Sequence, residues 1–210
     1  MDELLRETVQ AGSVEGILDA VRRGADVNAR DEGGETALSY ATSIELGSER
    51  AKECVRCLIR LGARVSEEKP EGGLGTSVHR AAAHGYTEAL KELLSADGKV
   101  SLNTFDDMSR TPLICAVDDG HLVEASLLLE AGADVNANES EKIGDTALIR
   151  AVQNRNLPMV QLLLRHGADP TIPGWMQMSA LDRARDWADA PTPELREISE
   201  LLDEEAKRHA

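Results

Sequence analysis

Residues 111–137, TPLICAVDDGHLVEASLLLEAGADVNA, carry the pattern that decides the fold. Thr111 is a helix N-cap whose hydroxyl accepts from a backbone N–H, and Pro112 suits the first helical position, where no N–H is needed. Asp119-Gly120 ends this short helix, and a Leu-rich second helix follows. Gly132 ends the second helix, because glycine adopts positive φ without strain. The segment therefore predicts two short helices followed by an extended turn.

Copies of this unit recur along the chain. Gly24-Ala25-Asp26-Val27-Asn28-Ala29 repeats as residues 132–137, and shorter echoes begin at Gly62 and Gly167. The helix start recurs at Thr36, Thr76, Thr111, Thr146 and Ser179. Successive starts are separated by 40, 35, 35 and 33 residues, and three of these spacings lie close to a period of about 33.

The recurring pattern resembles the ankyrin-repeat family, and residues 111–137 carry the strongest resemblance. The resemblance implies an all-α fold, a solenoid of stacked helix-turn-helix units joined by hairpin-like loops. We expect one domain over residues 1–210, with repeats near residues 2–30, 31–66, 67–105, 106–138, 139–173 and 174–210. The first and last units are the least regular, as expected where a terminal face meets water.

Three departures from the pattern lie between or before the helices. About five extra residues fall within Ser43–Arg50, the third repeat has a glycine-rich entry at residues 70–75, and Glu139-Ser140 lengthens a later hairpin. We interpret these as loop variations on a regular array.

The net charge of the chain limits the classes of partner that it can bind. The formal net charge is −15, whereas a nucleic-acid binder needs cations to displace the counterions of phosphate. Nucleic acid and anionic membranes are therefore poor partners, and a basic protein surface is a better one because opposite charges steer association. Solubility alone is the alternative explanation of the acidic balance.

The N-terminal sequence and the cysteines indicate a cytoplasmic setting. MDELLRETVQAGS lacks the basic start and apolar run of a signal peptide, and no stretch approaches the apolar length of a membrane span. Cys54, Cys57 and Cys115 form no disulfide framework, and the Cys54/Cys57 pair has no second pair beside it to bind zinc. We interpret that pair as core packing with one half-exposed thiol. We expect a monomer.

The family resemblance implies that the first helices and the hairpin tips form a concave, partner-binding side. Tyr40, Phe105, Trp175 and Trp187 map to that side, and Tyr86 maps to a turn between helices. Tyr and Trp are favoured as buried anchors of interfaces. The scarce aromatics therefore point to a binding surface there.

Two further features mark this side. Met176 and Met178 flank Trp175, either to bind a partner or to fold back and close the stack. Acidic residues also gather on this side: Asp106 and Asp107 on one hairpin tip, Asp118 and Asp119 at the end of the first helix of the same repeat, and Glu32 and Glu35 in the second repeat. They predict a groove that is acidic in the middle and apolar at its C-terminal end, or simply a solvated face. The predicted partner-binding residues are Tyr40, Ile44, His84, Phe105, Asp107, Met108, Asp118, Asp119, Ile143, Trp175, Met176, Met178 and Trp187.

The sequence offers little support for catalysis. The family places structural imidazoles where His79 and His121 stand, and His84 is the one histidine expected free on the concave side. No serine has a nucleophile-elbow pattern, and the glycines near residue 73 do not match a phosphate cradle. We predict no enzyme, no metal and no cofactor.

Three functions remain open from the sequence. The first is a protein-binding scaffold or adaptor, and the second is a stoichiometric inhibitor such as a toxin-immunity protein. The third, an enzyme, is the least favoured, because a repeat stack presents a shallow groove where an enzyme wants a deep pocket.

Overall fold

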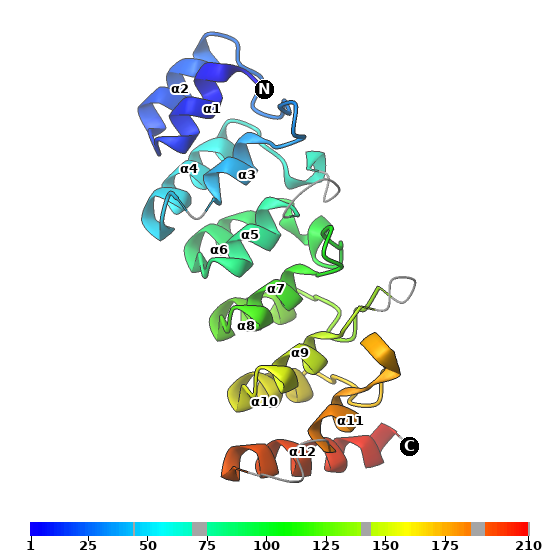
Figure 1. Ribbon diagram of the computed structural model, residues 1–210. Coiled ribbons are helices and arrows are strands. Elements are labelled where there is room, and N and C mark those ends of the chain that lie inside the picture. Colours follow the sequence, from blue (N-terminus) through cyan, green and yellow to red (C-terminus); the bar gives the residue numbers. More distant parts are fainter. Residues whose placement is uncertain (44, 69–74, 140–143, 186–191, 210) are drawn as a thin grey trace.

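The protein is an elongated column of stacked helix pairs with the two termini at opposite ends (Figure 1). The computed structural model describes residues 1–43, 45–68, 75–139, 144–185 and 192–209. These residues form twelve α-helices, three short 3-10 turns and no β-strand. The predicted all-α repeat architecture is confirmed.

Each layer of the column holds one helix pair. The pairs are α1 (Glu3–Gln10) with α2 (Val14–Arg22), α3 (Ala37–Ala41) with α4 (Ser48–Arg60), α5 (Ser77–Ala83) with α6 (Thr87–Ser95), α7 (Pro112–Asp118) with α8 (Leu122–Glu130), α9 (Ala147–Gln153) with α10 (Leu157–Arg165), and α11 (Ala180–Arg185) with α12 (Pro193–His209). The 3-10 turns are Val65–Glu67, Gly98–Ser101 and Trp175–Gln177. One pair lies within each predicted repeat, and the boundaries between repeats stay a prediction.

The N-caps fix where the first helices begin. The Thr111 hydroxyl accepts from the Ile114 N–H at 3.3 Å, and the Thr146 hydroxyl accepts from the Ile149 N–H at 3.3 Å. In α5 the cap is reinforced by a histidine, since the Thr76 N–H donates to His79 Nδ1 at 3.1 Å. Gly132 has a φ of 101°, which a residue with a Cβ would adopt only under strain.

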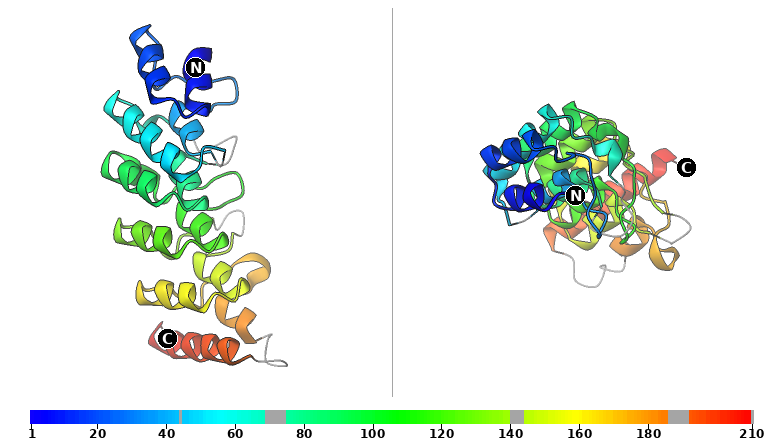
Figure 2. Two further views of the ribbon diagram at one scale, coloured as in Figure 1. Left: turned by 90° about the vertical axis from the view of Figure 1, so that its left-hand side faces the viewer. Right: turned by 90° about the horizontal axis from the view of Figure 1, so that it is seen from above.

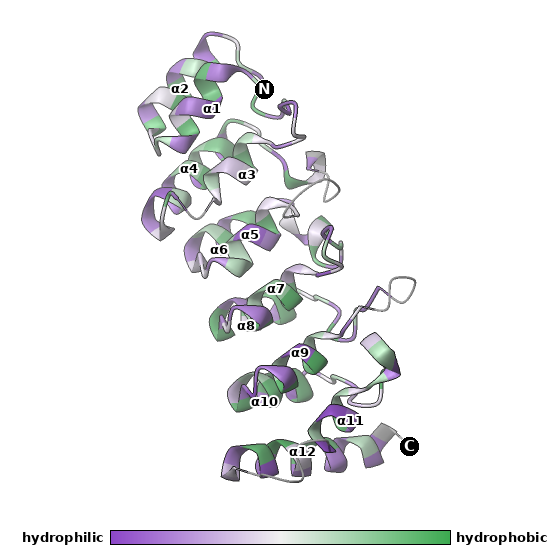
Figure 3. Ribbon diagram, viewed as in Figure 1, coloured by the Kyte–Doolittle hydropathy of each residue, from purple (hydrophilic) through white to green (hydrophobic). Residues whose placement is uncertain are grey.

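Apolar side chains of all the layers form one continuous core. The hydrophobic stretches of the helices are shown in green in Figure 3. Leu113 and Leu128 of the fourth pair are 1% and 0% exposed, and burying a leucine stabilises by roughly 2 kcal/mol. The small residue Ala116 is fully buried and lets α7 approach its neighbours closely. The core between the thin helical layers is therefore packed mainly with leucine and alanine, and it needs few aromatic side chains.

Asparagines that follow some of the second helices tie one layer to the next. The Asn136 side chain donates to the Gly167 carbonyl at 3.2 Å and accepts from the Asp169 N–H at 2.8 Å. Asn28 bonds the Gly62 carbonyl and the Arg64 N–H in the same way, each at 2.9 Å. The recurring Asp-Val-Asn stretch therefore holds the loops of consecutive repeats together.

The two irregular pairs differ in their second helices. The extra residues of the second repeat precede α4, which has 13 residues against nine in α6, α8 and α10. At the C-terminal end α12 has 17 residues and buries Leu195, Ile198 and Leu202 against the stack. Two further views show α12 lying across that end (Figure 2). Among the helices of the described residues, none has the length and apolarity to cross a membrane.

Candidate functional site

The first helices and the loops that precede them line one side of the column, which we term the hairpin face. It comprises α1, α3, α5, α7, α9 and α11 with their loops, and the second helices form the opposite side, the back (Figure 1). Most of the predicted partner-binding residues that the structure describes belong to the hairpin face.

Arginine recurs at one position of the hairpin face, four residues after the helix N-cap. The arginines at this position are Arg6, Arg80, Arg150 and Arg183. Each has a solvent-shielded Nε with no hydrogen-bond partner among the described residues. These arginines were not among the residues predicted from the sequence. Aligning the repeats on their helix N-caps places all of them at one position.

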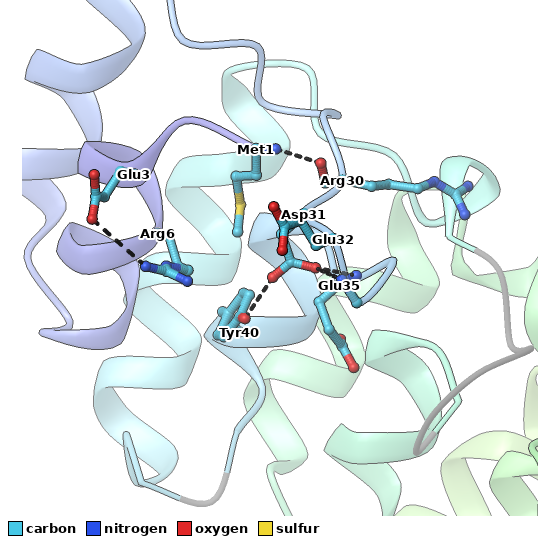
Figure 4. Close-up of a pocket in the computed structure, with 9 residues that line it drawn as sticks. Met1, Glu3, Arg6, Arg30, Asp31, Glu32, Glu35 and Tyr40 are labelled. Atoms are coloured by element: carbon cyan, nitrogen blue, oxygen red, sulfur yellow. Dashed lines mark hydrogen bonds and ion pairs between the residues drawn. The ribbon is translucent and has the colours of Figure 1, made fainter.

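A pocket of about 730 Å³ lies at the N-terminal end of the hairpin face (Figure 4). Asp31 accepts from the Tyr40 hydroxyl at 2.6 Å and from the backbone N–H groups of Gly33 and Glu35, each at 2.9 Å. Burial raises the pKa of Asp31, but these hydrogen bonds outweigh it and leave the pKa below its ordinary value. Tyr40 is thus half-buried and already bonded within the chain.

Asp106 is the most completely bonded carboxylate of the face. Its side chain is 0% exposed and accepts from the N–H groups of Met108 and Arg110, each at 2.9 Å. The Arg110 guanidinium adds two more bonds, from Nε at 3.1 Å and from Nη2 at 2.9 Å. Both guanidinium bonds end on Oδ2 and both backbone bonds end on Oδ1, so this carboxylate shapes the hairpin that enters the fourth repeat.

An alternating chain of charges continues from Arg110 toward the C-terminus. Asp118 lies 3.9 Å from Arg110 Nη1 and 3.9 Å from Arg150 Nε. Arg150 Nε also lies 3.6 Å from Asp145, which is 3.3 Å from Arg183. Burial raises the pKa of Asp118, and the two arginines oppose that rise. The middle of the face, expected to be acidic, therefore holds arginines that balance its aspartates.

Trp175 and Met176 project from the last hairpin and are 58% and 64% exposed. Met176 has a φ of 62° and Gln177 a φ of 58°, both in the left-handed region that non-glycine residues enter at a cost of roughly 1 kcal/mol or more. Asp145 holds the turn by accepting from the Trp175 N–H at 2.9 Å, and Arg183 donates to the Trp175 carbonyl at 3.2 Å. The stack is closed by α12, so these side chains are left outside it.

The other predicted residues are distributed as follows. Asp107, Met108 and Asp119 are exposed, and Phe105, Met178 and His84 are intermediate in exposure. The His84 ring lies 5.6 Å from that of Tyr86, and burial lowers its pKa. Ile44, Ile143 and Trp187 lie outside the described residues.

His79 is a structural imidazole. Its Nδ1 accepts from the Thr76 N–H, so Nε2 carries the proton and donates to the Thr104 carbonyl at 3.1 Å. Burial lowers the pKa of His79 to about 4. The described residues contain no group of three or more His, Cys, Asp or Glu side chains arranged to hold a metal ion.

The cysteines differ in one respect from the sequence interpretation. Cys54, Cys57 and Cys115 are all free and buried, so neither thiol of the Cys54/Cys57 pair is half-exposed as expected. Burial raises the pKa of Cys54 to about 11 and that of Cys115 to about 12, which leaves both thiols protonated and unreactive at neutral pH.

Comparison with known families gives one consistent match. The model for ankyrin repeats in three copies matches residues 5–106 and again residues 78–173. In sequence, the chain is 33% identical over 120 residues to the candidate E3 ubiquitin-protein ligase XBAT34 of Arabidopsis thaliana, which covers 57% of this chain and 30% of the ligase. It is 32% identical over 104 residues to human Rabankyrin-5, covering 46% of this chain and 9% of that protein.

Solved structures match over nearly the whole chain. An ankyrin repeat domain from Acinetobacter baumannii superposes with a TM-score of 0.78 at 27% identity, covering 97% of this chain and 98% of that domain. The ankyrin repeat domain of Bcl-3, a member of the IkappaB family, gives a TM-score of 0.73 at 27% identity, covering 95% and 86%. The curated relatives matched in sequence are much longer than this chain, which spans less than a third of their length.

Proposed function

The chain belongs to the ankyrin-repeat family, and we propose that it binds a partner protein through its hairpin face. Ankyrin repeats are protein–protein interaction modules, and the fold is typically non-catalytic. Ubiquitin ligation is named for relatives of which this chain spans less than a third, so that activity is not carried over to it.

The exposed Trp175–Met176 turn is the observation that carries this proposal. Large apolar side chains in water favour burial by a partner, and tryptophan is among the residues most often found at the centre of interfaces. The turn is held from below by Asp145 and Arg183, so its backbone need not be ordered on binding. Met108 adds a second exposed apolar side chain on an earlier hairpin.

We propose a partner with a basic surface beside an apolar patch. The net charge of −15 attracts basic proteins over a distance, and Asp107 and Asp119 place exposed acidic residues on the hairpin face. The same charge repels nucleic acid and anionic membranes. We further propose that the chain acts as a monomer in the cytoplasm.

The test is capture of partners from a lysate of the source organism, with identification by mass spectrometry. A Trp175→Ala, Asp118→Ala, Asp119→Ala variant is compared with wild type and with a control variant in which exposed residues of the back are replaced. The control carries Glu53→Ala, Arg60→Ala and Arg165→Ala.

Loss of the main partner in the hairpin-face variant alone supports the proposal. Binding that is lost only in the back variant contradicts it. One dominant, tightly bound partner favours a stoichiometric inhibitor, and several weaker partners favour an adaptor.

A further inference from the structure

Arg150 and Asp118 are two charged groups of the hairpin face whose side chains form no hydrogen bond among the described residues. They lie on neighbouring first helices, α9 and α7, with Arg150 Nε 3.9 Å from Asp118 Oδ1. The two side chains are 36% and 21% exposed, so a partner has access to both. Arg150 Nε has no hydrogen-bond acceptor but is shielded from water, so a partner reaches the exposed remainder of this side chain and not Nε.

The neighbouring groups are already occupied. Asp145 accepts from the Trp175 N–H at 2.9 Å, from Arg183 at 3.3 Å and from the Gln153 amide at 3.2 Å. Arg110 donates two hydrogen bonds to Asp106. Among the described residues, no acceptor lies within hydrogen-bond distance of the Arg150 side chain and no donor lies within that distance of the Asp118 carboxylate, although both belong to a network of ion pairs.

The charges of the pair decide which group fits it. A carboxylate that approached Arg150 would lie close to Asp118 and be repelled, and a cation that approached Asp118 would be repelled by Arg150. A neutral group with an acceptor and a donor side by side satisfies both residues without an added charge. The peptide group of a polypeptide main chain has that arrangement, with its C=O and N–H.

We propose that Arg150 and Asp118 bind the main chain of an extended partner segment, with Arg150 donating to a carbonyl and Asp118 accepting from an N–H. The proposal rests on the hairpin face being the binding surface and names what that surface recognises. Asp145 links this pair to the Trp175 turn, so a segment lying across α7 and α9 would place an apolar side chain on Trp175 and Met176.

The experiment uses a displayed library of random linear 12-residue peptides selected on the wild-type protein. The affinity of an enriched peptide is measured for wild type, Arg150→Met, Asp118→Ala, Trp175→Ala and the back control Arg165→Gln. Copies of the peptide with a single N-methyl group on each backbone amide in turn remove one main-chain donor at a time. Urea unfolding of each variant verifies that it is folded.

We expect Arg150→Met and Asp118→Ala each to weaken binding tenfold or more, and Arg165→Gln to change it by less than twofold. One N-methylated peptide should lose a similar factor on wild type but not on Asp118→Ala, since that variant lacks the acceptor. A general structural effect of Asp118→Ala would weaken binding of all the peptides alike and would not depend on which peptide amide is methylated.

Peptides that lose binding with Trp175→Ala but not with Arg150→Met or Asp118→Ala would overturn this inference and leave the hairpin face as the binding surface. Peptides indifferent to all three substitutions would contradict both proposals. Failure of the selection to enrich any peptide would also overturn the main-chain inference, while the capture of a folded partner would still test the hairpin face.

Discussion

Asp106 and Asp118 both contact Arg110 on the hairpin face, and they are bonded in opposite ways. Asp106 is fully buried and accepts four hydrogen bonds from Met108 and Arg110. The Asp118 carboxylate accepts none and is held between two guanidinium groups, each 3.9 Å away. We infer from this comparison that a fully hydrogen-bonded carboxylate such as Asp106 stabilises the folded chain. A partly exposed carboxylate without a hydrogen bond, such as Asp118, can instead bind a partner.

The largest effect is expected at Asp106. Replacing it with Ala leaves the Arg110 guanidinium, whose side chain is mostly buried, without its carboxylate partner. Breaking a buried ion pair from one side typically costs about 3–5 kcal/mol, and we expect a loss of that size in the free energy of unfolding. Urea titration measures it, with the exposed Asp119→Ala as the control. A loss below about 1 kcal/mol would contradict the claim that Asp106 stabilises the folded chain more than Asp118 does.

A pH dependence of similar size is expected at His79. Its folded pKa of about 4 lies below the unfolded value of 6.5, so the unfolded chain binds the proton more readily. The stability contributed by neutral His79 is present above pH 6.5 and is lost as the pH falls from 6.5 toward 4, by roughly 3 kcal/mol.

The measurement compares the unfolding free energy at pH 7 and pH 4.5 for wild type and His79→Gln. Burial raises the pKa of Glu68, which acts in the opposite direction but is shared by both proteins. Equal pH dependence in the two proteins would show that His79 is not the fully bonded, neutral group described above.

Trp175→Ala should separate binding from stability. We expect it to weaken the partner complex by roughly 2 kcal/mol, because an exposed tryptophan that a partner covers is a typical anchor. The free energy of unfolding should change by less than about 0.5 kcal/mol, because the side chain packs little within the stack. Calorimetry with the captured partner and urea titration give the two values. The reverse pattern would assign Trp175 to the fold.

The smallest effect on stability is expected at the central pair. Arg150→Met and Asp118→Ala should each change the free energy of unfolding by less than about 1 kcal/mol, since half-exposed ion pairs without hydrogen bonds contribute little. Addition of 0.5 M salt should leave the difference from wild type nearly unchanged. A loss comparable to that of Asp106→Ala would show that the two aspartates do not differ in role.

The helix pairs could be predicted from the sequence because their signals are local. Thr111 caps α7 by accepting from the N–H of Ile114, three residues on, and Gly132 stands just after the C-cap of α8, so neither signal depends on the rest of the chain. The recurrence of these signals then fixes the stacking. The insertion near Ser43 was likewise visible, although its consequence, a longer α4, was not.

The polar network could not be predicted in the same way because its members meet only after the layers stack. Asp118 and Arg150 belong to different repeats, as do Asp145 and Arg183. Counting aspartates in the sequence therefore missed the arginines that the fold brings to Asp106, Asp118 and Asp145. The half-exposed thiol expected of the Cys54/Cys57 pair was wrong for the same reason, since packing of α4 against neighbouring layers covers both cysteines.

Hydrogen–deuterium exchange of the protein with and without its captured partner tests the central claim most directly. The account predicts slower exchange on binding in residues 106–119 and 174–183, with little change in α6 and α8 on the back. Protection confined to the second helices, with residues 106–119 and 174–183 unchanged, would contradict the hairpin face as the binding surface.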